Sequence, residues 1–191
     1  MKKAKKGQFG YIKYRRVCHL IVAIVLYLMA VSLYIAGVKT TGDNKNLLTI
    51  VAILGCLPAS QSLVTSILGF RAKACTKERF EIIEKRLDDS MISVYDLYFT
   101  TYEKNYPVSH MVLKNNCLCG LMDKSKHSSQ DLQKYLEETF LKNGIKGVSI
   151  KIFESSLEDK YFNRLEELKK LDHSKGPLDE DVIRLICDIT Y

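Results

Sequence analysis

Two long stretches of this 191-residue sequence contain no charged side chain. They are residues 17–38 and residues 47–70, which are 22 and 24 residues long. At a helical rise of about 1.5 Å per residue, each can cross the roughly 30 Å hydrocarbon core of a membrane. A chain in lipid must satisfy its own backbone hydrogen bonds, so we expect two transmembrane helices joined by the short external loop 39–46.

The first 16 residues contain no acidic side chain, although they hold seven basic ones. The formal net charge of the whole chain is also +7, so residues 17–191 are balanced. This asymmetry predicts a contact with an anionic surface at one end, made by a disordered basic tail. A secretory signal also starts with a basic segment, but its apolar part is only about 7–15 residues long, so an uncleaved hairpin is favoured.

Basic residues are concentrated before the first apolar stretch and after the second, and are few in the loop between them. Residues 1–16 carry seven and residues 71–86 carry six, whereas the loop carries only Lys39 and Lys45. The positive-inside rule therefore predicts a multi-pass protein of the cell membrane with both termini cytoplasmic. The side chains expected to contact anionic headgroups of the lipid bilayer are Lys2, Lys3, Lys5, Lys6, Lys13, Arg15, Arg16, Arg71 and Lys73.

Small residues recur along the second apolar stretch at alternating spacings of 3 and 4. This predicted helix-packing seam consists of Ala52, Gly55, Ala59, Ser62, Ser66 and Gly69. Small side chains let helix backbones approach closely in lipid. Two partners for the seam are open: the first transmembrane helix, where Ala23, Ala30 and Gly37 repeat every seven residues, or a second copy of the protein.

The rest of the chain predicts an α+β fold. After a basic juxtamembrane helix over residues 71–90, the cytoplasmic domain 91–191 is expected to contain four strands, three of them consecutive. Lys114-Asn115-Asn116 predicts a tight hairpin, and Ser155 with Glu158 predicts a capping box at a helix start. The predicted element order is αβββαβαα, with strands near 93–100, 108–113, 117–122 and 147–153.

Short motifs for common enzyme chemistry are missing. There is no Walker lysine loop, G-x-G-x-x-G or G-x-S-x-G. Cys117 and Cys119 have C-x-C spacing, not the C-x-x-C of zinc and redox sites. We predict no catalytic residue, no metal ligand and no cofactor. Cys75 is either an idle thiol or a palmitoylation site close to the membrane.

The αβββαβ order over residues 77–153 resembles the core topology of PD-(D/E)xK nucleases. In that family, an acidic residue near the second strand and an E-x-K on the third hold a divalent ion. Here the second strand offers Ser109 and His110, and His110 is interpreted as a packed histidine. Asp96 and Glu103 are isolated. The topology is therefore similar, while the motif of the family is absent.

The segments YDLYFTTYEKNYPVSHMVLKNNCLCG and VSIKIF resemble small two-span membrane proteins of bacteria with a cytoplasmic α+β domain. The resemblance implies the layout above and no activity. Between a bacterial plasma membrane and a eukaryotic organelle, which the sequence does not separate, we favour the former. We expect a non-enzymatic binding or assembly subunit that binds a protein partner or forms homo-oligomers. Two alternatives are open: a membrane-tethered divergent enzyme of nuclease-like topology, and an oligomeric channel or transport accessory. The mild acidity of the distal domain argues against nucleic-acid binding.

Overall fold

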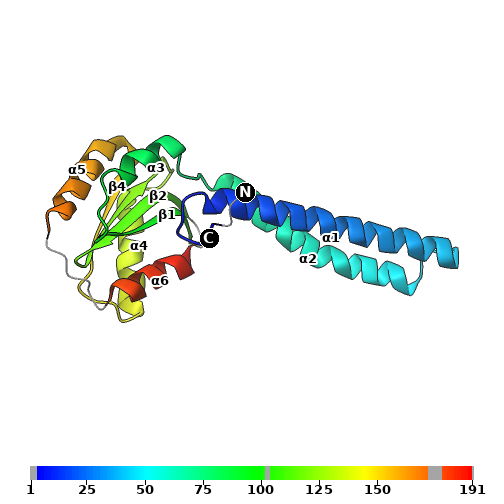
Figure 1. The fold of residues 1–191 in the computed structure, drawn as a ribbon. Coiled ribbons are helices and arrows are strands. Elements are labelled where there is room, and N and C mark those ends of the chain that lie inside the picture. The colour runs from blue at the N-terminus through cyan, green and yellow to red at the C-terminus, as the bar shows by residue number, and fades with distance from the viewer. Residues whose placement is uncertain (1–3, 102–103, 172–177, 191) are drawn as a thin grey trace. The chain divides into compact units, whose positions relative to one another are not determined.

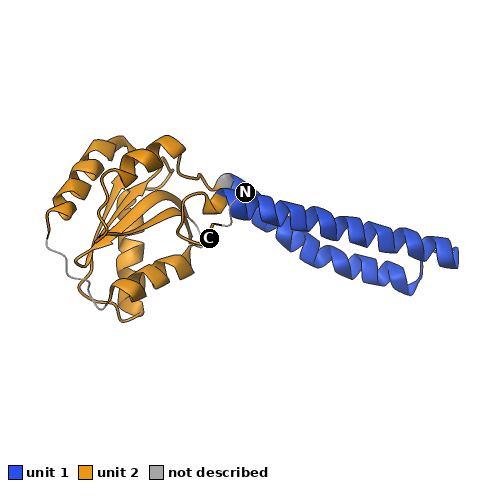
Figure 2. Ribbon diagram, in the orientation of Figure 1, with its two compact units in different colours: residues 1, 13–71 blue, residues 2–12, 72–191 orange. Residues whose placement is uncertain are grey.

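The computed structural model describes residues 4–101, 104–171 and 178–190. The chain forms two compact units, drawn in different colours in Figure 2. The first is Lys13–Arg71, and the second joins Lys2–Ile12 to Ala72–Tyr191. The segment before the first long helix therefore belongs to the same unit as the C-terminal domain.

The first unit is a hairpin of two long helices, α1 (Tyr11–Thr41) and α2 (Leu47–Arg71). Both are long and apolar enough to cross a membrane. Asn46 caps the start of α2, because its Oδ1 accepts a hydrogen bond from the backbone N–H of Thr49 at 2.8 Å. The helix α2 continues through Pro58.

The second unit is an α+β domain with a four-stranded mixed sheet. Its elements are α3 (Lys77–Glu84), β1 (Ile92–Thr100), β2 (Asn105–Lys114), β3 (Cys117–Met122), α4 (Ser129–Lys142), β4 (Ser149–Glu154), the 3-10 turn η1 (Ser155–Leu157), α5 (Glu158–Lys169) and α6 (Asp179–Ile189). Apart from the added η1, this is the predicted order αβββαβαα. The predicted hairpin at Lys114–Asn116 is confirmed, since Asn115 and Asn116 both have positive φ, at 49° and 58°.

The sheet lies between two helical layers (Figure 1). Its strand order is β1-β2-β3-β4, antiparallel for the first two pairs and parallel for β3 and β4. The parallel pair needs a crossover connection, which α4 provides. One face packs on α4 and α6 through residues such as Leu136, Phe140 and Ile186. The other packs on α3 and α5 through residues such as Ile83 and Leu165.

An irregularity crosses the sheet at Asp96 on β1 and Ser109 on β2. The β1–β2 ladder pairs Tyr95 with His110 and then Leu97 with Val108, so the two residues between are skipped. The β2–β3 register also shifts at Ser109. Asp96 has a φ of 54°, the left-handed region that aspartate tolerates better than most residues. In a regular strand, residues three positions apart face opposite sides of the sheet. The bulge at Asp96 reverses this alternation, so that Val94 and Leu97 face the same layer.

Two local predictions differ from the structure. The helix expected up to residue 90 ends at Glu84, and the following Asp88-Asp89-Ser90 forms a turn in which the Ser90 hydroxyl donates to Asp88 at 3.0 Å. The capping box at Ser155 is wrong. Residues Ser155–Leu157 form η1 without a side-chain cap, and the Glu158 carboxylate instead binds a side chain described below.

Candidate functional site

Asp96 joins two segments that flank the hairpin in sequence. Its side chain is buried, with a residue exposure of 1%. The Oδ2 atom accepts a hydrogen bond from the backbone N–H of Gly10, and Oδ1 accepts one from the backbone N–H of Cys75, each at 2.7 Å. Gly10 precedes the first apolar stretch and Cys75 follows the second. One carboxylate in the bulge of β1 therefore holds both chain segments within the second unit.

The N-terminal segment is packed on the α+β domain, so the prediction of a disordered tail is wrong for residues 4–12. The backbone N–H of Tyr95 donates to the carbonyl of Gly7 at 2.8 Å. The ring of Phe9 stacks on that of Phe80 at 4.2 Å between centroids. The physical reason lies in Gly7 and Phe9, which give this basic segment a backbone that approaches β1 closely and an apolar side chain to bury.

The predicted headgroup ligands have different surroundings. Lys2 and Lys3 lie outside the described residues, and the side chain of Arg71 is likewise not described. Lys6 donates to the backbone carbonyl of Thr190, so its ammonium group is engaged within the domain. Lys5 and Lys73 are exposed. In the first unit, Lys13 is exposed, Arg15 is half-buried, and the guanidinium of Arg16 stacks on the ring of Phe70 at 4.4 Å.

A charged network closes the carboxyl end of β3. Arg79 donates to Asp123 at 2.6 Å and to Glu158 at 2.8 Å, and also to the hydroxyl of Ser109 at 3.1 Å. Ser109 in turn donates to Asp123 at 2.5 Å. Burial opposes the charge of Arg79, but the hydrogen bonds that it donates to Asp123 and Glu158, together with their negative charges, outweigh this effect and raise its pKa. The single guanidinium thus faces two carboxylates that it binds directly, an arrangement typical of a structural ion-pair network.

Beside this network lies a polar crevice of about 230 Å³, between the loop after β3 and the turn after β4. Crevices at the carboxyl ends of parallel strands are common ligand sites in sheets covered by helices. The N-terminus of α4 opens nearby, but Glu154 already occupies it: its Oε1 accepts from the N–H and hydroxyl of Ser129 at 3.3 and 3.1 Å.

His110 is buried between two tyrosines on the opposite side of the sheet from α4. Its Nδ1 shares a hydrogen bond of 2.6 Å with the hydroxyl of Tyr161, and its ring lies 4.4 Å from that of Tyr95. Burial lowers the pKa of His110 to about 3, so the imidazole is neutral. Its Nε2 has no hydrogen-bond partner among the described residues. This agrees with the interpretation of a packed histidine.

Cys75 favours the idle-thiol interpretation over palmitoylation. The residue is 1% exposed, and burial followed by the nearby Asp96 carboxylate raises the pKa of its thiol to about 12. A protonated, inaccessible thiol is a poor nucleophile. The same buried region contains Tyr95, whose pKa is raised first by burial and then by its hydrogen bond to Glu84 at 2.7 Å.

The acidic residues considered for a metal site are not gathered into one. Asp96 is committed to backbone amides, and Glu103 lies outside the described residues. No group of three or more potential metal ligands occurs in the part of the chain that the structure describes. A chemical signal for Asp96 was present in the sequence: aspartate is disfavoured in strands, yet it stands in the middle of the β-rich run SVYDLYFT.

The helix-packing seam of α2 faces α1 within the first unit. Ala59 and Ser66 are 0% exposed, and the Ser66 hydroxyl donates to the carbonyl of Arg16 at 3.1 Å. A Cβ placed on Gly55 would lie 3.9 Å from the Cβ of Ala30. Of the two partners left open by the sequence, this hairpin therefore contains the intramolecular one.

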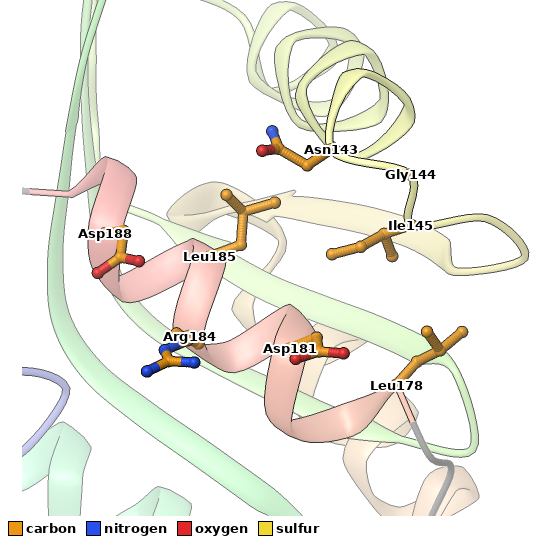
Figure 3. Close-up of a pocket in the computed structure, with 8 residues that line it drawn as sticks. All are labelled: Asn143, Gly144, Ile145, Leu178, Asp181, Arg184, Leu185 and Asp188. Atoms are coloured by element: carbon orange, nitrogen blue, oxygen red, sulfur yellow. The ribbon is translucent and has the colours of Figure 1, made fainter.

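A second hollow of about 290 Å³ lies between α6 and the turn after α4, and Figure 3 shows its lining. Ile145, Leu178 and Leu185 supply apolar surface. Arg184 and Asp188, both exposed, supply charge on α6. Partly exposed apolar side chains beside an arginine are a combination found at surfaces that bind proteins. Sequence reasoning missed this groove, because it depends on how the turn at Gly144 approaches α6.

Comparison of the chain with protein-family profiles, with curated proteins and with solved structures found no match.

Proposed function

We propose that this protein is an integral protein of the bacterial plasma membrane, anchored by the hairpin α1–α2, whose cytoplasmic α+β domain is a non-enzymatic binding or assembly subunit. The observation that carries the topology is the pair of hydrogen bonds that Asp96 accepts from Gly10 and Cys75. Segments bound to one carboxylate must lie on the same side of a membrane. The Lys/Arg bias then assigns that side to the cytoplasm.

Exposure on the hairpin supports insertion in lipid. Apart from Ile82, Leu141, Leu157 and Leu171, every exposed large hydrophobic side chain among the described residues lies on α1 or α2. A core helix of a soluble protein would bury this surface, whereas a transmembrane helix presents it to acyl chains. A contiguous apolar surface of this kind is otherwise rare in a soluble monomer.

The binding role rests on the hollow between α6 and the turn after α4, which we call the α6 groove. At the polar end of the sheet, the guanidinium of Arg79 is engaged by both Asp123 and Glu158. The groove, by contrast, combines partly exposed apolar side chains with an exposed Arg184. We assign it to a protein partner or a second copy of the chain.

Labelling of single cysteines tests the topology in the full chain, with the native cysteines replaced. Asn44→Cys in the loop between the helices should react with a membrane-impermeant maleimide added outside intact cells. Gln8→Cys and Lys160→Cys, both exposed positions of the second unit, should react only in inverted vesicles. Labelling of Gln8→Cys from outside would overturn the proposed orientation.

Native mass spectrometry of the detergent-solubilised protein tests the binding role separately. We expect an oligomer or a stoichiometric co-purifying protein that Arg184→Glu weakens and Lys160→Glu, a charge reversal on the opposite helical layer, leaves intact. A strictly monomeric protein without a co-purifying partner would contradict the binding role and leave the membrane topology untouched.

A further inference from the structure

A hollow of about 320 Å³ lies where the carboxyl ends of α3 and α5 approach each other. It is lined by Lys85, Arg86, Glu166, Lys169 and Lys170, and we call it the basic pocket. Four cationic side chains thus surround a single carboxylate. The pocket is distinct from the groove on α6, because α3 and α5 cover the other face of the sheet.

Arg86 lies at this pocket with most of its donor capacity unused. Its guanidinium sits on the ring of Phe162, 4.7 Å from the centroid, and one nitrogen donates to the carbonyl of Ile82 at 3.0 Å. The nearest carboxylate oxygen, on Glu166, is 3.7 Å from Nε, beyond hydrogen-bond distance. Nε is buried and has no hydrogen-bond partner among the described residues.

The lysines of the pocket have no close carboxylate partner. Lys85, Lys169 and Lys170 are exposed, and their ammonium groups form no ion pair with any described carboxylate within 4.0 Å. Arg79 shows the difference, because it belongs to the same basic segment and is neutralised by Asp123 and Glu158. The basic pocket is therefore a local excess of positive charge.

Basic residues at the carboxyl end of a helix also stabilise the helix dipole, which is a structural role distinct from ligand binding. At the end of α5, Lys114, which is 3% exposed, already has this structural role. Its Nζ lies 3.4 Å from the carbonyl of Lys169 and 3.9 Å from the carboxylate of Asp88. At the end of α3, Arg86 donates to the carbonyl of Ile82, and the exposed lysines exceed what the two helix ends require.

We infer that the basic pocket binds a phosphate group, with the guanidinium of Arg86 as the directional ligand and the three lysines as surrounding charge. Arginine forms paired hydrogen bonds to phosphate oxygens, and lysine acts as a point charge. The phosphate belongs either to a phospholipid headgroup or to a soluble molecule. This inference is independent of the protein-binding role of α6.

Calorimetric titration tests it on the full chain in nanodiscs of zwitterionic phosphatidylcholine, with inorganic pyrophosphate as the probe. Arg86→Gln should weaken binding about tenfold or more, as expected for loss of a charged hydrogen-bonding partner. Lys160→Gln, which removes an equally exposed lysine of α5 outside the pocket, should have little effect. An unchanged thermal unfolding midpoint of Arg86→Gln shows that the pocket, and not the fold, has been altered.

A second measurement separates the two sources of phosphate. Native mass spectrometry after extraction from membranes containing phosphatidic acid records retained lipid. Retention that is lost in Arg86→Gln, without pyrophosphate binding, assigns the pocket to a lipid headgroup. Pyrophosphate binding that is lost in the variant assigns it to a soluble phosphate. If neither probe binds, or if Arg86→Gln and Lys160→Gln weaken binding equally, the inference is overturned.

Discussion

The hairpin and the α+β domain bury opposite kinds of side chain. In the hairpin, the buried positions are small, such as Ala30, Ala52 and Ala59, while residues such as Leu57 point outward. In the domain, the fully buried side chains are large, such as Leu136 and Tyr161. The large apolar side chains of the hairpin are exposed, whereas those of the domain are buried.

The difference is the one expected if the hairpin is inserted in lipid, as proposed, and the domain lies in water. In water, removing large apolar side chains from solvent drives folding, so they occupy the interior. In lipid, that drive between helices is absent, and close packing of small residues and occasional hydrogen bonds hold helices together. The same contrast explains the polar groups. The domain binds a buried Asp96 through backbone amides from distant segments, whereas the hairpin relies on contacts such as Ser66 to the Arg16 carbonyl.

The largest expected contrast comes from one substitution made in both units. Leu136→Ala should lower the free energy of unfolding of the α+β domain by about 3 to 4 kcal/mol, because it leaves a cavity in a fully buried site. Leu57→Ala removes the same atoms from a side chain that is 68% exposed, and in a bilayer it should cost much less. Chemical denaturation followed by near-ultraviolet circular dichroism, on the full chain in detergent, measures both. Equal losses would break the comparison.

Asp96→Ala tests the polar anchor of the domain. It removes the acceptor of two backbone hydrogen bonds, and we expect a loss of about 3 kcal/mol. Hydrogen exchange should rise in residues 4–10 more than in β3, because the N-terminal segment loses its attachment. Asp96→Asn keeps one acceptor and tolerates positive φ, so its effect should be smaller, and Asp89→Ala, an exposed aspartate, should be nearly neutral. An unchanged exchange rate at Gly10 would refute the role of Asp96.

The sequence predicted the features of this comparison that depend on local pattern. Uncharged length predicted both hairpin helices, and alternation with turn residues predicted the four strands and their order. The small-residue stripe predicted the buried face of α2. It did not predict that residues 4–12 join the domain, because this segment, with two lysines, gains its structure from contacts with Phe80 and β1, which lie far along the chain. The hydrogen-bond partners of Asp96, the groove at α6 and the basic pocket likewise depend on tertiary contacts, which hydrophobic periodicity in the sequence does not reveal.

His110 should make the domain acid-sensitive in a way that the hairpin is not. The folded protein holds the pKa of His110 at about 3, while an unfolded histidine titrates near 6.5. Between these values the unfolded state binds the extra proton, so stability falls as pH decreases from about 6.5 and is fully present above it. By about pH 4.5 the loss from this residue is about 2 to 3 kcal/mol.

His110→Gln isolates that contribution from the carboxylates that titrate in the same range. The amide retains an acceptor for the Tyr161 hydroxyl but lacks the ring that packs against Tyr95, so the variant should be less stable at neutral pH. Because an amide does not titrate, the variant should lose less stability on acidification. Denaturant midpoints at neutral and acidic pH measure the difference. If the stability of the wild type and of His110→Gln falls equally between neutral and acidic pH, the buried imidazole is not the cause of the loss of stability in acid.

The seam is sensitive to added volume rather than to lost volume. Ala59→Leu should weaken the packing of α2 on α1 by about 2 kcal/mol, because the site is 0% exposed and overpacking forces the helices apart. Ile53→Leu, at a position that is 64% exposed, is the matched neutral change. A disulfide reports the packing directly. With the native cysteines replaced, Ala30→Cys and Gly55→Cys should crosslink within one chain, since their Cβ atoms would lie 3.9 Å apart. Crosslinked dimers instead would show that the seam joins two copies.

The smallest expected effect concerns the glycine that lets the N-terminal segment approach β1. Gly7 has a φ of 84°, and a Cβ there would lie 3.1 Å from Cγ1 of Val94, so Gly7→Ala combines backbone strain with a tight contact. Gly147 has nearly the same φ, 83°, with no atom within 4 Å of a new Cβ, so Gly147→Ala supplies the strain alone. We expect a loss of about 1 kcal/mol for Gly147→Ala and about 2 kcal/mol for Gly7→Ala. The excess at Gly7 measures how tightly the N-terminal segment is held against the sheet. If the two variants are equally stable, residues 4–12 attach to the domain mainly through Asp96 and Phe9 and not through the close approach of Gly7 to Val94.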